Sequence, residues 1–568
     1  MTKLYKNHHN RLKIILIVCL SFMLVSTIKT FYLQVFKSQD KSIEIQKIVK
    51  GDRGVIYDRN LTKLAYDINF YDLYLNKNEI TDIYSIKYFL NEYFEYNTSN
   101  LDSIINISKK SDVLIVEGVP YYKIDELSEV LKLYPQIKKS IQYKGRYYPE
   151  KSLASQIIGK FSHKNDTIGR WGVERILNEL IKAKKNKLSF SVTSRGRIKK
   201  RFLEDEYLAL SGQDVMLTID IEYQKILEQE LIRQMENTES KSANGLIINP
   251  FNGEILAIAS VPSSNLNNKL KEIELIRDYV CNFSYEPGST LKPFSILAGM
   301  KNNKINLEDK YFCENGRYKI PGLNRKRYIQ DHEPHDTLSV NEILAHSSNI
   351  GLVKVSSDIG MESIYNTFRE FGFGQRPMLD EYSTSAGLMK DLNKWNIHSL
   401  VSIPIGQELR VTNLQIGLAY SAIANGGYLI KPKLFYKKNH NNESSQIVRK
   451  VANETDLDKL VESLKLVVSN GTAAQALENH SICSYGKTGT AQVYDKDSRA
   501  YSDSLFISTY AGVFPCENPK LVCVISFINP EVDKKWASQS AVPAFREIIN
   551  RIVNRDQNLS MDIAHEIR

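Results

Sequence analysis

The order of strand-like and helical patterns along this chain of 568 residues predicts an α+β fold, in which helices cover an antiparallel sheet. Two apolar runs around a Pro/Asn/Gly turn at 245–259 indicate a β-hairpin. Helical spacing of apolar residues dominates from 289 to about 425, and strand-like runs follow at 506–513 and 521–527. A last helix is expected to begin near Val542.

The N-terminus predicts a single membrane-spanning helix. The first thirteen residues carry four basic side chains and no acid, and the stretch from Ile14 to Ile28 is uncharged and mostly apolar. A basic flank before an apolar segment places the N-terminus in the cytoplasm and the bulk of the chain outside. Because no Ala-x-Ala-like cleavage site follows, a retained anchor is favoured over the alternative, a cleaved signal peptide.

The chain is too long for one ordinary hydrophobic core, so two or more domains are expected, with a boundary near Gly212. Residues from about 65 to 145 mix strand-like runs with amphipathic helical patterns, such as Ile124–Leu131, and hold no cluster of catalytic groups. Beyond the boundary, Val215–Ile219 is strand-like and Ile221–Glu239 has helical spacing. The expected divisions are a cytoplasmic tail at 1–13, a transmembrane anchor at 14–36, a mixed N-terminal pedestal domain at 37–211, a C-terminal catalytic domain at 212–555 and a tail at 556–568.

Charge and cysteine distribution argue against a nucleic-acid partner and against cysteine-based structural sites. The net charge of +10 is spread over 75 basic and 65 acidic residues without a basic stripe, so no nucleic-acid partner is expected. Six cysteines occur without a Cys-x-x-Cys pair, and one of them, Cys19, lies in the apolar N-terminal run. The spacing therefore predicts neither a disulfide framework nor a zinc site.

The stretch Glu286–Phe294 carries the first candidate for chemistry, Ser289 followed three residues later by Lys292. If a helix begins near Gly288, the two side chains share one face. A neutral lysine can then take the serine proton and make the hydroxyl a nucleophile. Alone the spacing is weak, because Ser-x-x-Lys also occurs at Ser26–Lys29, Ser38–Lys41 and Ser484–Lys487.

Two later motifs strengthen the assignment. Ser347-Ser-Asn349 is a Ser-x-Asn, and Lys487-Thr-Gly-Thr490 contains the only Lys-Thr-Gly of the chain. Ser-x-x-Lys, Ser-x-Asn and Lys-Thr-Gly in this order are typical of penicillin-recognising serine enzymes. The alternative for Ser347 and Asn349 is an ordinary helix cap, since both residue types favour caps. Thr488 could likewise be an ordinary strand residue.

Two other patterns are interpreted as structural. Glu174-x-x-Leu-Asn178 resembles the motif of class A β-lactamases, but it precedes Ser289, whereas in that family it follows the serine. We expect it to lie on a packed helix. Asp331-His-Glu-Pro-His335 offers two histidines around a proline, a poor helical ligand pair with no evident third ligand. We therefore expect a loop there, no metal and no cofactor.

Taken together, these motifs resemble those of class B penicillin-binding proteins, the membrane-anchored D,D-transpeptidases of bacterial cell walls. The resemblance implies a dimerisation-like pedestal and a C-terminal penicillin-binding transpeptidase domain. It covers nearly the whole chain, and only about 65–145 matches weakly. Its further motifs are Arg53–Arg59, Gly169–Glu174, Asn249–Glu254, Ser347-Ser-Asn-Ile-Gly351, Thr412-Asn-Leu-Gln415, Ala424-Asn-Gly-Gly427 and Lys487-Thr-Gly-Thr-Ala-Gln492.

By this resemblance, Ser289 attacks the peptide bond between the two terminal D-alanines of a peptidoglycan stem pentapeptide. Lys292 accepts the serine proton. Ser347 relays a proton to the leaving amine, and Asn349 orients the substrate amide and Lys292. Lys487 adds a positive electrostatic potential to the site. A second stem peptide then resolves the acyl-enzyme.

The same resemblance assigns roles to the strand that follows Lys487. The hydroxyls of Thr488 and Thr490 would hold the terminal carboxylate of the donor. Backbone N–H groups of Ser289 and Thr490 would form the oxyanion hole. Gly489 would let the substrate strand lie against the sheet edge.

Three alternatives remain at this point: a catalytically dead wall-binding scaffold, a β-lactamase, and the elongation-specific branch of the family. Ser347-Ser-Asn-Ile-Gly351 favours the division (septal) branch. The resemblance implies β-lactam antibiotics as ligands, and a polytopic membrane glycosyltransferase and other divisome proteins as partners. It places the protein in the bacterial cytoplasmic (inner) membrane.

Overall fold

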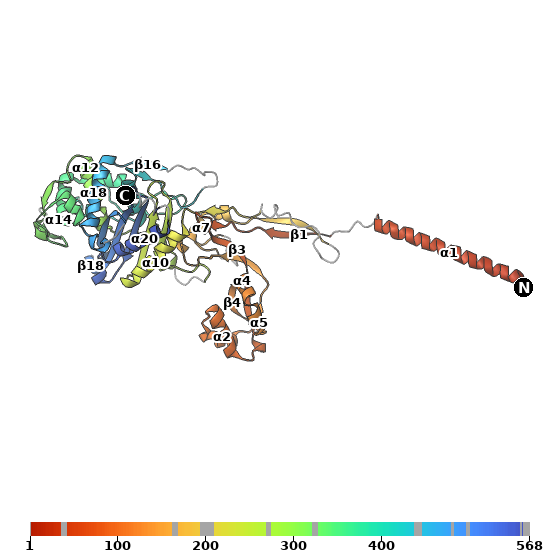
Figure 1. Cartoon of the computed structure of the whole chain (residues 1–568). Coiled ribbons are helices and arrows are strands. Elements are labelled where there is room, and N and C mark those ends of the chain that lie inside the picture. The colour runs from red at the N-terminus through yellow and green to blue at the C-terminus, as the bar shows by residue number, and fades with distance from the viewer. Residues whose placement is uncertain are drawn as a thin grey trace. The chain divides into compact units, whose positions relative to one another are not determined.

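The computed structural model of the chain forms two compact units, residues 1–53 with 182–212 and residues 54–181 with 213–568 (Figure 1). Most of the predicted tail at 556–568 lies outside the described part. The structure describes residues 2–35, 43–161, 168–192, 210–268, 274–320, 328–436, 446–478, 482–495, 500–556 and 559.

The first unit consists of one long helix and a two-stranded ribbon. Helix α1 (Thr2–Val35) is exposed wherever its side chains are described. Its segment His8–Val35 is long enough to cross a membrane and contains an 18-residue stretch with a mean hydropathy of 2.3. It contains the predicted anchor at 14–36 except its last residue, which lies outside the described part. Strands β1 (Ile43–Lys50) and β7 (Lys185–Val192) pair antiparallel along their full length.

The second unit begins with a small sheet built on β3 (Lys63–Asn76), to which β2, β4, β5 and β6 are paired. The C-terminal part of β3 packs on the short helices that follow it. They share an apolar cluster that includes Leu75, Phe89 and Leu90. The bounds are β2 Ile56–Tyr57, α2 Ile83–Phe94, α3 Leu101–Ile107, β4 Asp112–Pro120, α4 Tyr121–Glu126, α5 Ser128–Lys132, β5 Ile137–Lys139 and β6 Tyr143–Tyr147.

A buried ion cluster joins this sheet to the helix that carries the β-lactamase-like pattern. Glu174 lies in α7 (Gly172–Ile176), and Arg146 donates to it at 2.6 Å with both side chains fully buried. Arg146 also pairs with Asp67 at 3.3 Å and donates to the Gly54 carbonyl. Removing one partner of such a cluster would leave a buried charge unpaired. Glu174 therefore has a structural role, as its misplaced motif predicts.

The main sheet of the second unit has five antiparallel strands in the order β10-β9-β19-β18-β17. The predicted hairpin and both predicted strand runs are confirmed as parts of it. Its first hairpin pairs with β19, so the last strand of the chain lies in the middle. The bounds are β9 Ser242–Ile248, β10 Ile255–Val261, β17 Tyr485–Asp495, β18 Ala500–Phe514 and β19 Leu521–Ile528.

Helices cover both faces of this sheet, as the α+β prediction requires. A Cβ on Gly245 would collide with Leu227 of α10 (Ile221–Asn237), whereas the next residue, Leu246, reaches Gly417 of α17 (Asn413–Ala424) on the other face. Successive strand residues point to opposite faces, so α10 and α17 lie on opposite sides. The C-terminal helix α20 (Ala541–Arg555) packs beside α10 (Figure 1).

Two sequence expectations need adjustment within this unit. The strand-like run Val215–Ile219 forms only β8 (Val215–Met216), which pairs in parallel with β2. The helical pattern of Ile124–Leu131 is divided at Leu127 into α4 and α5. The predicted helix at 221–239 is confirmed as α10 and the last helix as α20.

The remaining helices, short strands and 3-10 turns complete the second unit. The helices are α6 Ser155–Ile158, α8 Asn178–Ile181, α11 Tyr279–Asn282, α12 Lys292–Lys301, α13 Val340–Ala345, α14 Asn349–Ile359, α15 Met361–Glu370, α16 Ile397–Ser402, α18 Glu454–Ser469 and α19 Ala474–Leu477. The short strands are β11 Lys310–Phe312, β12 Arg317–Lys319, β13 Tyr328–Gln330, β14 Thr337–Ser339, β15 Tyr428–Ile430 and β16 Ile447–Lys450. The 3-10 turns are η1 Lys77–Glu79, η2 Thr98–Asn100, η3 Glu274–Ile276, η4 Gly288–Leu291, η5 Glu314–Gly316, η6 Leu392–Lys394 and η7 Val532–Lys534.

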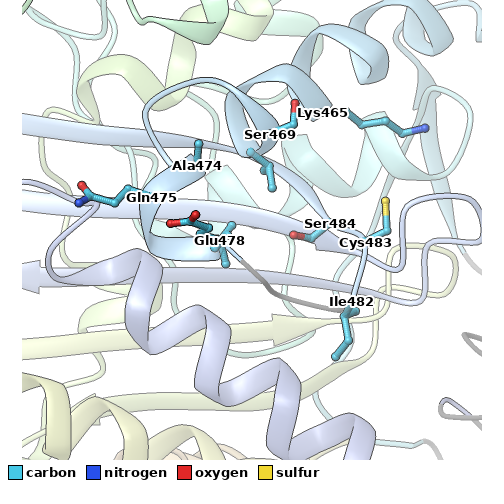
Figure 2. A pocket seen from close by; sticks show the side chains of 10 residues that line it. Lys465, Ser469, Ala474, Gln475, Glu478, Ile482, Cys483 and Ser484 are labelled. Carbon is cyan, nitrogen blue, oxygen red and sulfur yellow. The ribbon is translucent and has the colours of Figure 1, made fainter.

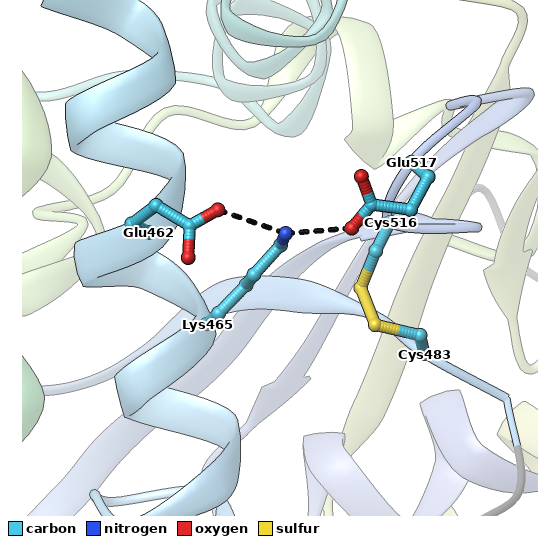
Figure 3. Close-up of a disulfide and its surroundings, with 5 residues drawn as sticks. All are labelled: Glu462, Lys465, Cys483, Cys516 and Glu517. Atoms are coloured by element: carbon cyan, nitrogen blue, oxygen red, sulfur yellow. Dashed lines mark hydrogen bonds and ion pairs between the residues drawn. A yellow bond between two sulfur atoms is a disulfide. The ribbon is translucent and has the colours of Figure 1, made fainter.

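The expectation that the cysteines form no disulfide framework is corrected at one pair. Cys483 and Cys516 are bonded, with their Cα atoms 5.3 Å apart, so the bridge joins the start of β17 to the turn between β18 and β19 (Figure 3). Beside it, Lys465 pairs with Glu462 at 2.9 Å and Glu517 at 2.8 Å. Sheet pairing brings these cysteines together across 33 residues of sequence, which cysteine spacing alone could not show.

Candidate active site

The serine of the first motif lies where a tight turn enters a buried helix. Ser289 is half-buried in η4, and Lys292 begins α12, so the two lie one turn apart, as predicted. Gly288 has a φ of +57°, and its N–H donates to the carbonyl of Gly406. A Cβ on Gly406 would lie 2.0 Å from the Gly288 carbonyl oxygen. Glycine at position 406 therefore lets the loop close over the turn that presents Ser289.

Lys292 is fully buried, and its amine points into the second motif. Nζ donates to the backbone carbonyl of Ser347 at 2.5 Å and to Oδ1 of Asn349 at 2.8 Å. Burial lowers the pKa of Lys292 to about 7, although nearby Asp331 acts in the opposite direction. Near neutral pH a substantial fraction of this amine is therefore unprotonated and able to accept a proton.

In the second motif, the residue that caps a helix is Ser348, not Ser347 or Asn349. Ser348 caps α14, and its Oγ accepts from the N–H of Gly351 at 2.9 Å. Asn349 directs its side chain to Lys292 and to the carbonyl of Gln330. Ser347 has a φ of +60°, a left-handed conformation that is rare for residues other than glycine. Such strain persists only where surrounding structure imposes it, and it concentrates at functional sites.

Asp331 is a residue of this site that the sequence did not identify as such. Its Oδ1 accepts from the N–H groups of Asn349 and Ile350 at 2.6 and 3.0 Å, and its Oδ2 accepts from Ser348 Oγ. A carboxylate is favourable at a helix N-terminus. Asp331 thus fixes the start of α14, and with it the position of Asn349. The motif Asp331–His335 was considered only as a possible metal ligand set, so its capping role was missed.

The third motif lies on the edge strand β17, next to the serine turn. Lys487 is fully buried, and Thr488 Oγ1 is within hydrogen-bond distance of Thr472 Oγ1 at 2.6 Å. Thr490 is half-buried, and its Oγ1 accepts from the Ala537 N–H at 3.2 Å. Thr472 and Ala537 come from segments without a motif, so the sequence gave no signal for them.

Gly489 has a packing reason to be glycine that the sequence did not indicate. A Cβ there would lie 2.6 Å from the Pro287 carbonyl oxygen and 2.9 Å from a side-chain carbon of Thr290. The side of Gly489 on which a side chain would lie therefore contacts η4, the turn that carries Ser289. Glycine brings β17 against η4, and this close contact sets how far the third motif lies from Ser289.

The two buried lysines influence each other. Burial lowers the pKa of Lys487 well below its ordinary value, and the charge of Lys292 lowers it further. Two like charges in one low-dielectric site repel each other, so protonation of one amine disfavours protonation of the other. The pair can therefore supply a base and a positive charge at the same time.

The hydroxyl of Ser289 and the amine of Lys292 are not hydrogen-bonded to each other in the described structure. Within the part of the chain that the structure describes, neither Ser289 Oγ nor Ser347 Oγ makes a hydrogen bond, while Lys292 is occupied by Ser347 O and Asn349. Catalytic hydrogen bonds are often long in unliganded enzymes and tighten when substrate binds. The three motifs nevertheless converge, as the sequence predicts.

A separate cavity of about 620 Å³ lies at the start of β17, between α18 and α19, and contains none of the motif residues (Figure 2). Its lining mixes apolar side chains with polar groups such as Glu478 and Ser484. Cys483 of the disulfide also lines it. This cavity is distinct from the serine site, which is an open edge between β17, η4 and the start of α14.

Comparison with known families matches residues 245–550, more than half of the chain, to the penicillin-binding protein transpeptidase domain. Residues 48–217 match the penicillin-binding protein dimerisation domain. The chain belongs to the class B penicillin-binding proteins. Its C-terminal domain is a transpeptidase domain, and the protein is an enzyme of that class.

Individual relatives agree with this assignment. The chain is similar to a peptidoglycan D,D-transpeptidase FtsI homolog of Mesostigma viride, at 26% identity over 92% of both chains. It is also similar to the stage V sporulation protein D of Bacillus subtilis, at 26% identity over 88% of this chain and 77% of that one.

Solved structures show the same fold. Penicillin-binding protein 3 of Mycobacterium tuberculosis, in complex with aztreonam, has a TM-score of 0.66 at 20% identity, with 90% of this chain and 97% of that one covered. Penicillin-binding protein 2X of Streptococcus thermophilus has a TM-score of 0.67 at 20% identity, over 91% and 81%.

Proposed function

We propose that this class B peptidoglycan D,D-transpeptidase works through an acyl-enzyme on Ser289 and cross-links stem peptides in the septal wall. The single observation that carries the mechanism is the buried amine of Lys292, one turn from Ser289 and bonded to Asn349. A buried lysine of lowered pKa beside a serine is the arrangement that activates a hydroxyl nucleophile.

In the acylation step, Ser289 Oγ attacks the carbonyl between the two terminal D-alanines of a stem pentapeptide. Lys292 takes the serine proton, and the terminal D-alanine leaves after its nitrogen receives a proton through Ser347. Asn349, which holds Lys292, also orients the substrate amide. The acyl group on Ser289 is then transferred to the amine of a second stem peptide, and the serine recovers its proton.

The edge strand β17 supplies the binding groups of the proposal. Backbone N–H groups of Ser289 and Thr490 form the oxyanion hole, where each donor is worth roughly 3–4 kcal/mol in related acyl transfers. The hydroxyls of Thr488 and Thr490, with the field of Lys487, hold the terminal carboxylate of the donor. The strand edge leaves room for an extended peptide beside Gly489.

A labelling experiment tests this mechanism. Fluorescent penicillin should label the wild type in a long-lived 1:1 adduct that peptide mapping places on Ser289, and Ser289→Ala should not be labelled. Ser284→Ala, a half-buried serine five residues earlier, serves as the matched control and should label normally. An adduct on another residue, or labelling of Ser289→Ala, would remove the serine assignment. Rapid hydrolysis of a chromogenic β-lactam would indicate a β-lactamase instead.

The septal role rests on the second motif. It reads Ser347-Ser-Asn349 and is followed by Ile350 and Gly351, as in division-type members of the family. In this fold a Cβ on Gly351 would lie 2.6 Å from Ile343, so α14 needs this glycine to pack on α13. We infer a partnership with a polytopic membrane glycosyltransferase and other divisome proteins, because the region before Gly212 has no glycosyltransferase-like cluster.

Depletion of the protein in its own cells tests the septal role. Filaments with blocked septa are expected. Swollen, round cells would assign the enzyme to the elongation machine, which is the second candidate. This outcome is independent of the labelling result, because both branches acylate a serine.

A further inference from the structure

Three side chains beside the second motif form a cluster that transpeptidation does not use. Glu333 and His335 lie on the loop after β13, and His346 follows the last residue of α13. Their potential ligand atoms all lie within 4.8 Å of one another, and the two imidazole rings are 4.9 Å apart between centroids. The histidines are half-buried and Glu333 is exposed, so the cluster is open to solvent on one side.

His335 is held in the orientation of a metal ligand. Its Nδ1 lies 3.1 Å from the backbone carbonyl of Glu333. A carbonyl oxygen can only accept, so this contact requires the proton on Nδ1, and in the neutral imidazole it leaves the lone pair on Nε2. Histidines that bind metals commonly donate their other ring N–H to a carbonyl or carboxylate in this way.

Glu333 supplies the carboxylate of the cluster. In the described part of the chain, no lysine or arginine pairs with it. A second carboxylate near His346, that of Glu342, is already used, because its Oε2 accepts from the N–H and the hydroxyl of Ser339 at 2.7 and 2.9 Å. Glu333 is therefore the carboxylate available to the two histidines.

We propose that Glu333, His335 and His346 bind one divalent transition-metal ion, with zinc as the expected occupant and water in the fourth position. Two imidazoles and one carboxylate form a ligand set that zinc takes in proteins, and imidazole favours zinc over magnesium or calcium. Zinc–ligand bonds of about 2.0–2.2 Å put tetrahedral ligand atoms roughly 3.4 Å apart. Binding would therefore require the three groups, whose ligand atoms lie within 4.8 Å of one another, to move closer by side-chain rotation.

The bound ion would link the loop after β13 to the end of α13, the two segments that lead to Ser347. Glu333 and His335 lie on the loop that carries Asp331, which holds the N-terminus of α14. His346 immediately precedes Ser347, whose left-handed backbone is strained. An ion shared by these segments would fix the entry to the second motif. It would also stabilise the folded chain by mass action.

A zinc titration of the full chain in detergent tests the site. Protein stripped with a chelator is titrated with zinc in competition with a chromophoric chelator, and its thermal unfolding is recorded with and without zinc. The wild type should bind one equivalent, and its unfolding temperature should rise with zinc. His335→Gln and His346→Gln should each bind at least tenfold more weakly, with little rise in that temperature.

The chain offers a matched control in His332, which stacks on Trp536 with ring centroids 4.1 Å apart and is not part of the cluster. His332→Gln should bind zinc like the wild type. Glu333→Gln changes only an exposed residue, so loss of binding in this variant supports the site even if a histidine variant unfolds. The proposal fails if the wild type takes up no zinc, or if His332→Gln weakens binding as much as His335→Gln. His8 and His9 are present in every variant, so zinc bound there does not alter the comparison.

Discussion

Two lysine side chains with no exposed surface set the chemistry of this site. Lys292 and Lys487 are each flanked by oxygen atoms, but no carboxylate bonds directly to either of them in the described structure. Asp331 is near Lys292 but is occupied by the N-terminus of α14. A buried lysine without an ion-pair partner readily loses its proton. The amine of Lys292 can therefore act as a base in a way that an exposed lysine cannot.

Replacing Lys292 by alanine should slow acylation by penicillin by about 10²–10⁴-fold, the range that general-base steps contribute, while the fold survives. The reason is that Ser289 loses the group that takes its proton. Stopped-flow or gel measurement of the acylation rate checks this, with thermal unfolding to confirm that the protein is folded. Lys301→Ala, at the other end of the same helix, is the control. Near-normal acylation of the Lys292 variant would mean that another group is the base.

The acylation rate should also rise with pH through about 7. Only neutral Lys292 can accept a proton, and its pKa is lowered to about 7. Below that value the neutral fraction falls about tenfold per pH unit, and above it the rate levels off. The second-order rate of penicillin acylation between pH 5.5 and 9 measures this. A rate that still rises tenfold per pH unit at pH 9 would show that Lys292 keeps an ordinary pKa in the folded protein.

At the scale of elements, strand β17 is fixed on three sides. It pairs with β18 from Tyr485 to Asp495, contacts the serine turn through Gly489, and is joined at its start to the β18–β19 turn by the disulfide. The position of the third motif therefore depends on the sheet and on η4 together. Small displacements of an edge strand would otherwise change the distance between reacting groups, to which rates are sensitive.

Loss of the disulfide should lower the free energy of unfolding by about 3–4 kcal/mol, the amount that chain entropy gives for a closed loop of this length. The loop spans a sequence separation of 33 residues. Guanidinium unfolding of the wild type and of the double variant Cys483→Ser with Cys516→Ser measures the difference. A reducing agent should destabilise the wild type and leave the variant unchanged. Equal stability of the two oxidised proteins would show that the bridge does not form.

The sequence predicted the elements that carry motifs better than those that support them. The hairpin at 245–259, the strands before the C-terminus and the convergence of Ser289, Lys292 and Lys487 all follow from local pattern and motif order. Asp331 could not be assigned, because its role depends on a loop that folds back onto α14. The Cys483–Cys516 pair was missed for the same reason, since sheet register brings the two together.

Gly489 shows a second limit of local patterns. The motif indicates a glycine at this position. The physical reason is that a Cβ on residue 489 would collide with Pro287, about two hundred residues earlier in the chain. The three clustered residues Glu333, His335 and His346 were hidden in the same way. The sequence offered His332 and His335 as a pair, whereas the structure pairs His335 with His346. Which side chains meet across a loop is set by tertiary packing, and short motifs do not record it.

At the scale of the whole molecule, the N-terminal helix should remain attached to the mature protein. Its apolar stretch, His8–Val35, is long enough to span a bilayer and follows a basic segment without a cleavage signal. N-terminal sequencing of membrane-extracted protein should therefore start at the first residues of the chain. Protease added outside the cytoplasmic membrane should reach the region beyond about residue 37. A mature start near residue 30 would show that the segment is a signal peptide.

The order of strands in the main sheet has a consequence for the timing of synthesis. Strands β9 and β10 are made early, but β17 and β18 join them only through β19, which is the last strand of the chain. Until residues 521–528 have emerged, β17 and β18 lack the strand that pairs them with β9. A chain that stops short of this strand should be inert rather than partly active. The sheet that carries the third motif should therefore be complete only after β19 has been made.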